Sequence, residues 1–241
     1  MRSQCSLALL VVLMCLCISR SNAEIALDKA FNDTSAIPLI ENSIKNYAAP
    51  RAKGMFSDNI GIFDGKEDED NSIFAWRISG KRYLSAIGRY TPDIAPLSDC
   101  DTNCDWIVNS HLVCHLFLFG ADTLSLASVT PLNIVHDRSL LRGKTRCSSV
   151  KAMAVAGAAR DSLLITLGYS DSAEPAEARY DPPEFITTVA LHFDPTPGVL
   201  RVEQRDDCLG NPNGYQTIAA ARKRLRECEA GITGSKESGN R

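Results

Sequence analysis

Residues 150–170 read VKAMAVAGAARDSLLITLGYS. Two mainly apolar runs, 150–157 and 162–170, flank the four residues Ala158-Ala159-Arg160-Asp161. Apolar runs of this length, bounded by a short polar turn, are typical of paired strands rather than of helices, which need longer periodic segments. This stretch therefore predicts an antiparallel β-hairpin.

The segment that follows repeats the arrangement. Residues 185–194 and 199–205 are joined by Pro195-Thr196-Pro197-Gly198, which favours a turn. They predict a second antiparallel hairpin. Between the two hairpins, 171–183 is polar and contains prolines, so we expect an exposed connector there.

The region before these hairpins also indicates strands. Residues 60–63 and 73–78 flank an acidic segment, 64–71, and predict a hairpin with a long acidic loop. Further strand candidates are 82–90, 106–119, 124–129 and 133–135.

Helical spacing of apolar residues occurs near both ends of the chain. Residues 37–47, beginning next to Pro38, predict a short helix. Residues 215–229 predict a second helix with one narrow apolar stripe and a basic, solvated remainder. The stripe consists of Ile218, Ala221, Leu225 and Cys228. The polar residues 231–241 predict a flexible tail.

Together these segments predict a mainly β fold, between all-β and α+β. We expect an antiparallel meander of hairpins in a sandwich-like arrangement, with the C-terminal helix packed on it. No repeat of fixed period is present, so a propeller is not favoured. The expected organisation is one disulfide-bonded domain over 24–230.

Residues 1–23 have the three parts of a cleavable secretory signal peptide. Arg2 supplies the charged start, 7–18 is apolar, and Ser21-Asn22-Ala23 offers small residues for cleavage. Twelve residues rise only about 18 Å as a helix, too little for a bilayer core of about 30 Å. We therefore expect a secreted or periplasmic chain that begins at Glu24 and has no membrane anchor.

Charge and the leader narrow the classes of partner. Cleavage removes two arginines and changes the formal net charge from −3 to −5, with 24 basic against 29 acidic residues. A mildly acidic surface argues against nucleic acid or an anionic membrane as the partner. Lipid attachment at Cys15 or Cys17 is the alternative for the leader, but neither follows the small residue that attachment needs.

Cleavage also leaves six of nine cysteines, an even number typical of a disulfide framework in an exported chain. The six are Cys100, Cys104, Cys114, Cys147, Cys208 and Cys228. A helix over 215–229 would place Cys228 about 20 Å from its first residue. The turn-forming segment after Cys208 would then have to extend fully to bridge the two. We therefore expect Cys228 to bond a cysteine outside the C-terminal segment.

One stretch resembles the start of a calcium-binding loop, in which alternate oxygen-bearing side chains converge on the ion. The residues are Asp99, Asp101, Asn103 and Asp105. The stretch departs from that pattern because Cys104 stands at the glycine position and Ser110 at the position of the bidentate Glu. We favour a polar loop held by disulfides and keep calcium as the alternative; no other cofactor is indicated.

His111 and His115 have the spacing that binds zinc on a helix. The metalloprotease Glu is missing after His111, and the surrounding residues favour a strand. A strand would separate the two side chains by about 13 Å, too far for a shared metal. Zinc is therefore not expected.

Residues 168–172, GYSDS, nearly match the nucleophile elbow G-x-S-x-G of serine hydrolases. The elbow needs a helix directly after the serine, and the proline-bearing connector makes that helix doubtful. His192 with Asp194, or His136 with Asp137, could complete a triad with Ser170. A secreted hydrolase using Ser170 and His192 is thus an alternative function.

The acidic run offers a possible contact surface. Its carboxylates at Glu67, Asp68, Glu69 and Asp70 would sit at a solvated hairpin tip or dock a basic partner. Asn32 begins the N-glycosylation sequon Asn-Asp-Thr. Because no catalytic set is complete, we expect an exported binding protein, for example an inhibitor or immunity-type protein, that acts on a protein partner.

Overall fold

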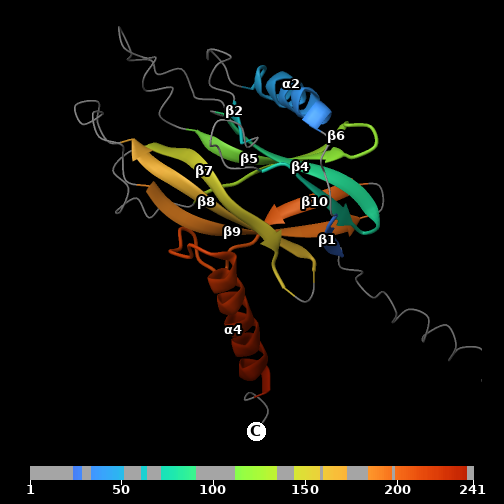
Figure 1. Cartoon of the computed structure of the whole chain (residues 1–241). Helices are drawn as coiled ribbons and strands as arrows, with labels where there is room; N and C mark the ends of the chain where they lie inside the picture. The colour runs from blue at the N-terminus through green and yellow to red at the C-terminus, as the bar shows by residue number, and fades with distance from the viewer. Residues whose placement is uncertain are drawn as a thin grey trace, which may run out of the picture.

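The computed structural model describes residues 24–28, 34–51, 61–63, 72–90, 112–134, 144–157, 160–172, 184–196 and 199–237. Two antiparallel sheets lie face to face, with helix α2 over the outer face of one and helix α4 against the other (Figure 1). The prediction of a mainly β, sandwich-like fold with a C-terminal helix is confirmed.

The first sheet has the strand order β1-β3-β4-β5-β6, and β2 also pairs with β4. Its strands are β1 (Ile25–Leu27), β2 (Gly61–Ile62), β3 (Phe74–Ile78), β4 (Lys81–Tyr90), β5 (Val113–Gly120) and β6 (Leu126–Pro131). Ser79 and Gly80 both have positive φ, 48° and 80°, and form the two-residue turn between β3 and β4. This is the backbone that matches the right-handed twist of a tight hairpin.

The second sheet has the order β10-β9-β8-β7 and consists of the two hairpins that the sequence predicts. Its strands are β7 (Lys144–Val155), β8 (Ser162–Ser172), β9 (Glu184–Thr196) and β10 (Val199–Gln204). The β7–β8 register shifts twice, between Cys147 and Ser149 and between Val150 and Ala152. Such bulges bend a strand and change which face its side chains meet.

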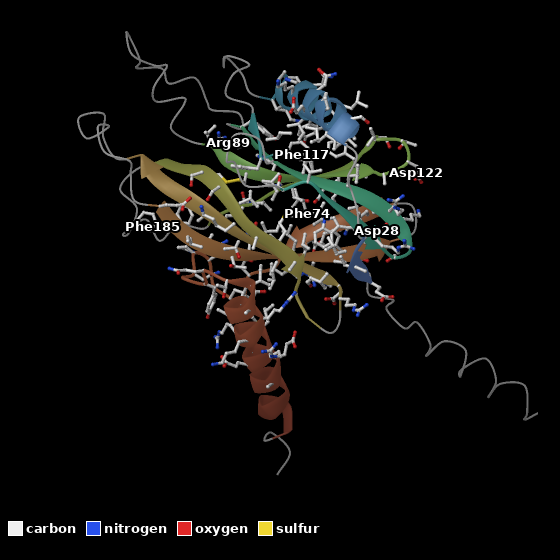
Figure 2. All side chains as sticks on the ribbon, in the orientation of Figure 1. Asp28, Phe74, Arg89, Phe117, Asp122 and Phe185 are labelled. Carbon is white, nitrogen blue, oxygen red and sulfur yellow. A yellow bond between two sulfur atoms is a disulfide. The ribbon has the colours of Figure 1, made fainter. Side chains whose placement is uncertain are left out.

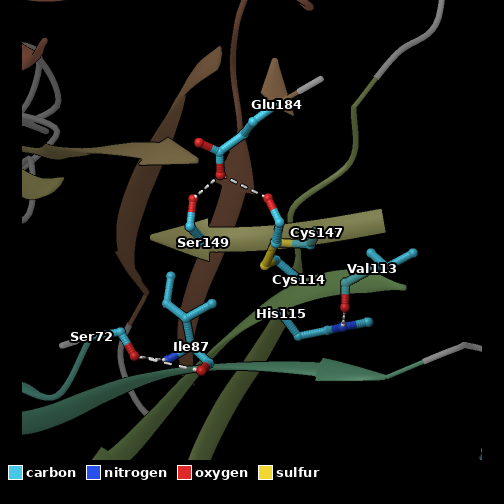
Figure 3. The surroundings of a disulfide bond; sticks show 9 residues. Ser72, Ile87, Val113, Cys114, His115, Cys147, Ser149 and Glu184 are labelled. Carbon is cyan, nitrogen blue, oxygen red and sulfur yellow. Dashed lines mark hydrogen bonds between the residues drawn. A yellow bond between two sulfur atoms is a disulfide. The ribbon is translucent and has the colours of Figure 1, made fainter. Parts of the chain in front are cut away.

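The predicted hairpin between 60–63 and 73–78 is wrong. Both segments pair with β4, with Ile62 opposite Gly88 and Phe74 opposite Ser85, so they lie end to end along one side of it. Residue Ser72 joins them, because its hydroxyl donates to the Phe63 carbonyl at 2.7 Å. The same hydroxyl accepts from the Ile87 amide at 2.8 Å (Figure 3). The segments before and after 64–71 therefore share one line of pairing along β4 and do not form a hairpin with each other.

The main core lies between the two sheets, where alternate side chains from the strands of each sheet face inward. A disulfide from Cys114 in β5 to Cys147 in β7 crosses this core, with Cα atoms 5.7 Å apart. Trp76 donates its indole N–H to Ser85 Oγ at 2.9 Å, which satisfies two buried polar groups. The largest fully buried members include Ile25, Ile78, Ile87, Leu116, Leu118, Leu163 and Phe193.

A second core lies between the first sheet and α2 (Ile37–Ala48), where Phe117 is enclosed (Figure 2). The helix is preceded by a 3-10 turn, Thr34–Ala36, and buries Ile40, Ile44 and Ala48. This confirms the helix predicted next to Pro38.

The third core packs the start of α4 (Ile218–Glu237) on the outer face of the second sheet. Ala221 is fully buried there, with Ile218 and Leu225 beside it, as the apolar stripe predicts. The helix runs to Glu237, beyond the predicted start of the polar tail, and its far end points away from the sandwich (Figure 1). No helix in the described ranges is long and apolar enough to cross a membrane.

The predicted pairing of Cys228 is wrong, because Cys228 bonds Cys208 with Cα atoms 5.7 Å apart. The helix begins at Ile218 rather than at Tyr215, so the helical rise to Cys228 is only about 15 Å. The loop after Cys208 can therefore run back along the helix, and Arg224 Nε donates to the Cys208 carbonyl at 3.1 Å. Cys100 and Cys104 lie outside the described residues.

Candidate functional site

Several predicted site residues lie outside the described residues. They are the calcium candidates Asp99, Asp101, Asn103 and Asp105, the acidic run Glu67, Asp68, Glu69 and Asp70, the sequon at Asn32, and the histidines His111 and His136. The calcium, docking and glycosylation hypotheses therefore stay predictions. Among the described residues, no group of three or more His, Cys, Asp or Glu side chains could hold a metal ion.

Ser170 and His192 are not brought together. Ser170 lies inside β8 and pairs with Glu184, so its backbone is extended instead of forming a strand-to-helix elbow. His192 on β9 stands opposite Ser162. Eight residues of strand separate Ser162 from Ser170, a distance of about 26 Å. The predicted hydrolase pair is therefore not assembled.

His192 instead meets Asp161 and Ser162, at the start of β8. Its Nδ1 lies 3.4 Å from Ser162 Oγ and 3.8 Å from Asp161 Oδ2. Ser162 donates its hydroxyl proton to Asp161 Oδ1 at 3.0 Å. A catalytic triad needs the acid on one ring nitrogen and the hydroxyl on the other. Here both neighbours face Nδ1, so this cluster orders the strand end and does not activate a nucleophile.

A polar cluster that sequence reasoning missed spans three strands of the second sheet. Glu184 Oε1 on β9 accepts hydrogen bonds from Ser149 Oγ at 2.6 Å and Ser148 Oγ at 2.9 Å (Figure 3). Lys151 Nζ lies 3.3 Å from its Oε2. The β7 bulge lets two consecutive serines reach the same carboxylate.

Gly168 on the intervening strand makes this reach possible. A Cβ there would lie 2.1 Å from Glu184 Oε1 and 2.2 Å from Ser149 Oγ. Partial burial acts to raise the pKa of Glu184, but the serine hydrogen bonds and the Lys151 ammonium outweigh it and hold the pKa below its usual range. A carboxylate with three donors and a lowered pKa is a poor general base. The cluster therefore fastens the sheet.

His115 lies in a buried aromatic group against α2. Its ring stacks on Tyr90 with centroids 4.1 Å apart, and its Nδ1 lies 3.1 Å from the Val113 carbonyl. Burial lowers the pKa of His115 to about 4, and burial raises the pKa of Tyr90 to about 12. His115 is therefore a neutral core residue at neutral pH.

The outer side of β1 offers the candidate binding site. In the antiparallel ladder with β3, Ser79 N donates to Glu24 O and Asp28 N donates to Ala75 O. Hydrogen-bonded pairs alternate with non-bonded ones along an antiparallel pair. The backbone groups of Ile25 and Leu27 must therefore point away from β3.

On that outer side, Ile25 N donates to the Arg160 carbonyl in the β7–β8 turn. The carbonyl of Ile25 and both backbone groups of Leu27 have no strand beside them within the described residues. Leu27 is 55% exposed, a high fraction for a large apolar side chain. β1 is thus an edge strand with one of its outer groups paired.

A groove of about 400 Å³ adjoins this edge. Its lining consists of Ile25, Ala26, Leu27, Val155, Gly157, Arg160 and Arg222. Arg222 on α4 donates from Nε and Nη2 to the Val155 carbonyl, which places its guanidinium at the groove. The sequence predicts that the basic residues of this helix are solvated, and Arg222 departs from that because it is half-buried.

The charged groups near β1 favour an anion. Both charged residues in the groove lining are arginines. Glu24 beside the groove lies 3.3 Å from Arg160 Nη1, with side chains 72% and 57% exposed, so water screens this pair. Asp28 at the other end of β1 is held by Arg82 at 2.8 Å and Arg77 at 3.5 Å (Figure 2).

No family model, curated protein or solved structure matches this chain.

Proposed function

We propose that this chain is an exported binding protein, secreted or periplasmic, that acts on a protein partner in the manner of an inhibitor or immunity-type protein. The observation that carries the proposal is the β1 edge, whose outward backbone groups and exposed Leu27 adjoin a groove lined by two arginines. An exposed apolar side chain on an unpaired sheet edge is costly to leave open, because it invites pairing with another chain.

Export is supported by two kinds of observation. Among the described residues two cysteine pairs are bonded, Cys114–Cys147 and Cys208–Cys228, and structural disulfides are typical of oxidising compartments. The leader 1–23 has the composition of a signal peptide. Mass spectrometry of the chain recovered from its native compartment should find Glu24 as the first residue. An intact leader on the recovered chain would contradict export by this route.

Site-specific photocrosslinking tests the binding role. A photoreactive phenylalanine at Leu27 is compared with the same residue at Leu39, which is equally exposed, 56%, but lies on α2. We expect one protein to crosslink from position 27 and not from position 39. That protein, purified separately, should bind the chain saturably and with fixed stoichiometry.

Equal crosslinking from both positions would show that the contacts are non-specific and would refute the proposal. So would a purified candidate that fails to bind. Hydrolysis of that protein by the chain would reverse the assignment from binding protein to enzyme.

A further inference from the structure

We infer that the β1 groove binds an extended acidic segment of the partner, which adds to the edge of β1 as a further strand. This inference rests on the proposed function, because it names the chemistry of the partner at the same site. Strand addition uses backbone hydrogen bonds for affinity and neighbouring side chains for specificity.

The backbone geometry favours an extended chain over a compact ligand. The Ile25 carbonyl and the two backbone groups of Leu27 recur at the spacing of a strand edge. The hydrogen bond from Ile25 N to the Arg160 carbonyl already forms the first rung on that side. A guest segment that continued from this rung would find one donor and two acceptors along β1.

The arginines select the charge of the guest. Arg222 uses two of its five N–H groups on the Val155 carbonyl, and the other three have no partner among the described residues. A guanidinium with open N–H groups binds a carboxylate with paired, charge-assisted hydrogen bonds. Arg160 would exchange its screened contact with Glu24 for a second ligand carboxylate.

Removal of the leader would strengthen the preference of the groove for an acidic guest. Cleavage after Ala23 would create an α-amino group on Glu24, beside the groove. That group is positively charged below its pKa of about 8. The guest that fits is therefore an extended chain with carboxylates on one face, and alternate Glu or Asp residues provide this because strand side chains alternate.

The probe is a fluorescein-labelled hexapeptide of alternating Glu and Val, with Gln/Val and Lys/Val versions as matched controls. Binding to the full chain, purified with its disulfides intact, is followed by fluorescence anisotropy. We expect saturable binding of the Glu peptide, at least tenfold weaker binding of the Gln peptide, and no binding of the Lys peptide. Raising the salt concentration from 50 to 500 mM should weaken binding of the Glu peptide more than binding of the Gln peptide. Equal binding of the Glu and Gln peptides would refute the role of the arginines.

Two substitutions separate the backbone from the side chain of Leu27. Leu27→Pro removes an N–H that points away from β3, so the β1–β3 ladder keeps its hydrogen bonds. Leu27→Ala removes the side chain and keeps the N–H. We expect at least a tenfold loss of affinity for Leu27→Pro and less than a threefold loss for Leu27→Ala. Equal losses would overturn strand addition.

Hydrogen exchange keeps the inference testable if Leu27→Pro does not fold. In the unaltered chain the peptide should slow exchange of the Leu27 amide at least tenfold. The Ala26 amide, which faces Arg77 in the ladder, should not change. An unchanged Leu27 amide under saturating peptide would refute the binding mode.

The two proposals fail separately. A crosslinked partner that binds while no acidic peptide does would refute this inference and leave the proposed function standing. Absence of any partner would refute both. Dimerisation of the chain that Leu27→Pro abolishes, measured by light scattering, would assign the edge to a second copy and overturn the acidic guest.

Discussion

Replacing His115 by phenylalanine should remove a defined part of the acid sensitivity of this fold. The histidine is only 4% exposed and stacks on Tyr90 at 4.1 Å. Burial lowers its pKa from 6.5 to about 4, because the charged ring would lose its hydration. The phenylalanine ring has a similar shape and carries no titratable group.

The direction in which stability changes with pH follows from the protons that the folded and unfolded chains bind. Between pH 6.5 and pH 4 the unfolded chain binds a proton at His115 and the folded chain does not, so stability falls as the pH falls. Above pH 6.5 the stability that depends on a neutral His115 is fully present. Below pH 4 His115 no longer makes the free energy of unfolding depend on pH. One pKa unit corresponds to about 1.4 kcal/mol, so the shift corresponds to about 3 kcal/mol in total.

Urea unfolding at pH 7.5 and pH 4.5 measures this quantity. Between these two pH values the free energy of unfolding should fall by about 2.5 kcal/mol more in the unaltered chain than in His115→Phe. Carboxylates such as Glu184 contribute to both chains, so the comparison cancels them. Tyr90→Phe is the control, because it keeps the stacked ring and His115 and should keep the pH dependence. If His115→Phe loses as much stability as the unaltered chain, the neutral buried histidine is refuted.

Three further outcomes are expected. Replacing both Cys208 and Cys228 by serine should lower the free energy of unfolding by about 3 kcal/mol, because the bridge closes a loop of 20 residues; an unchanged urea midpoint would contradict this. Gly168→Ala should destabilise by about 1–3 kcal/mol, because the new Cβ meets both Glu184 Oε1 and Ser149 Oγ, and combining it with Glu184→Ala and Ser149→Ala should remove most of that cost; additive losses in the triple variant would refute these contacts. Ser72→Ala should cost about 1–3 kcal/mol, because the buried Ile87 amide loses its acceptor; hydrogen exchange at Ile87 that stays slow would argue otherwise.

Most of the strands and both helices were predictable because each depends on a local pattern, whereas the three-residue strand β1 was not predicted. The turn-bounded runs around 158–161 and 195–198 predict the two hairpins, and the spacing of Ile218, Ala221 and Leu225 predicts the buried face of α4. These signals are local because the backbone period of a strand or a helix acts within a few residues.

The contacts between distant segments were not predictable in the same way. Cys228 meets Cys208 because the helix begins at Ile218, three residues later than predicted, and helix ends are poorly marked when turn residues precede them. Segments 60–63 and 73–78 looked like a hairpin, yet β4 pairs with both of them in one line. Strand partners are chosen by the whole sheet, and alternation of side chains does not record them.

The candidate site shows most clearly the difference between what local sequence patterns predict and what contacts between distant segments decide. The sequence alone predicted a β-rich body, a signal-like leader and, once that leader is removed, six cysteines that can pair. Only the tertiary structure decided that Arg160 and Arg222, 62 residues apart, share one groove with β1, and that Ser170 and His192 lie apart. Local periodicity determines which residues form strands and helices, whereas the position of a side chain across the sandwich depends on register, bulges and sheet packing.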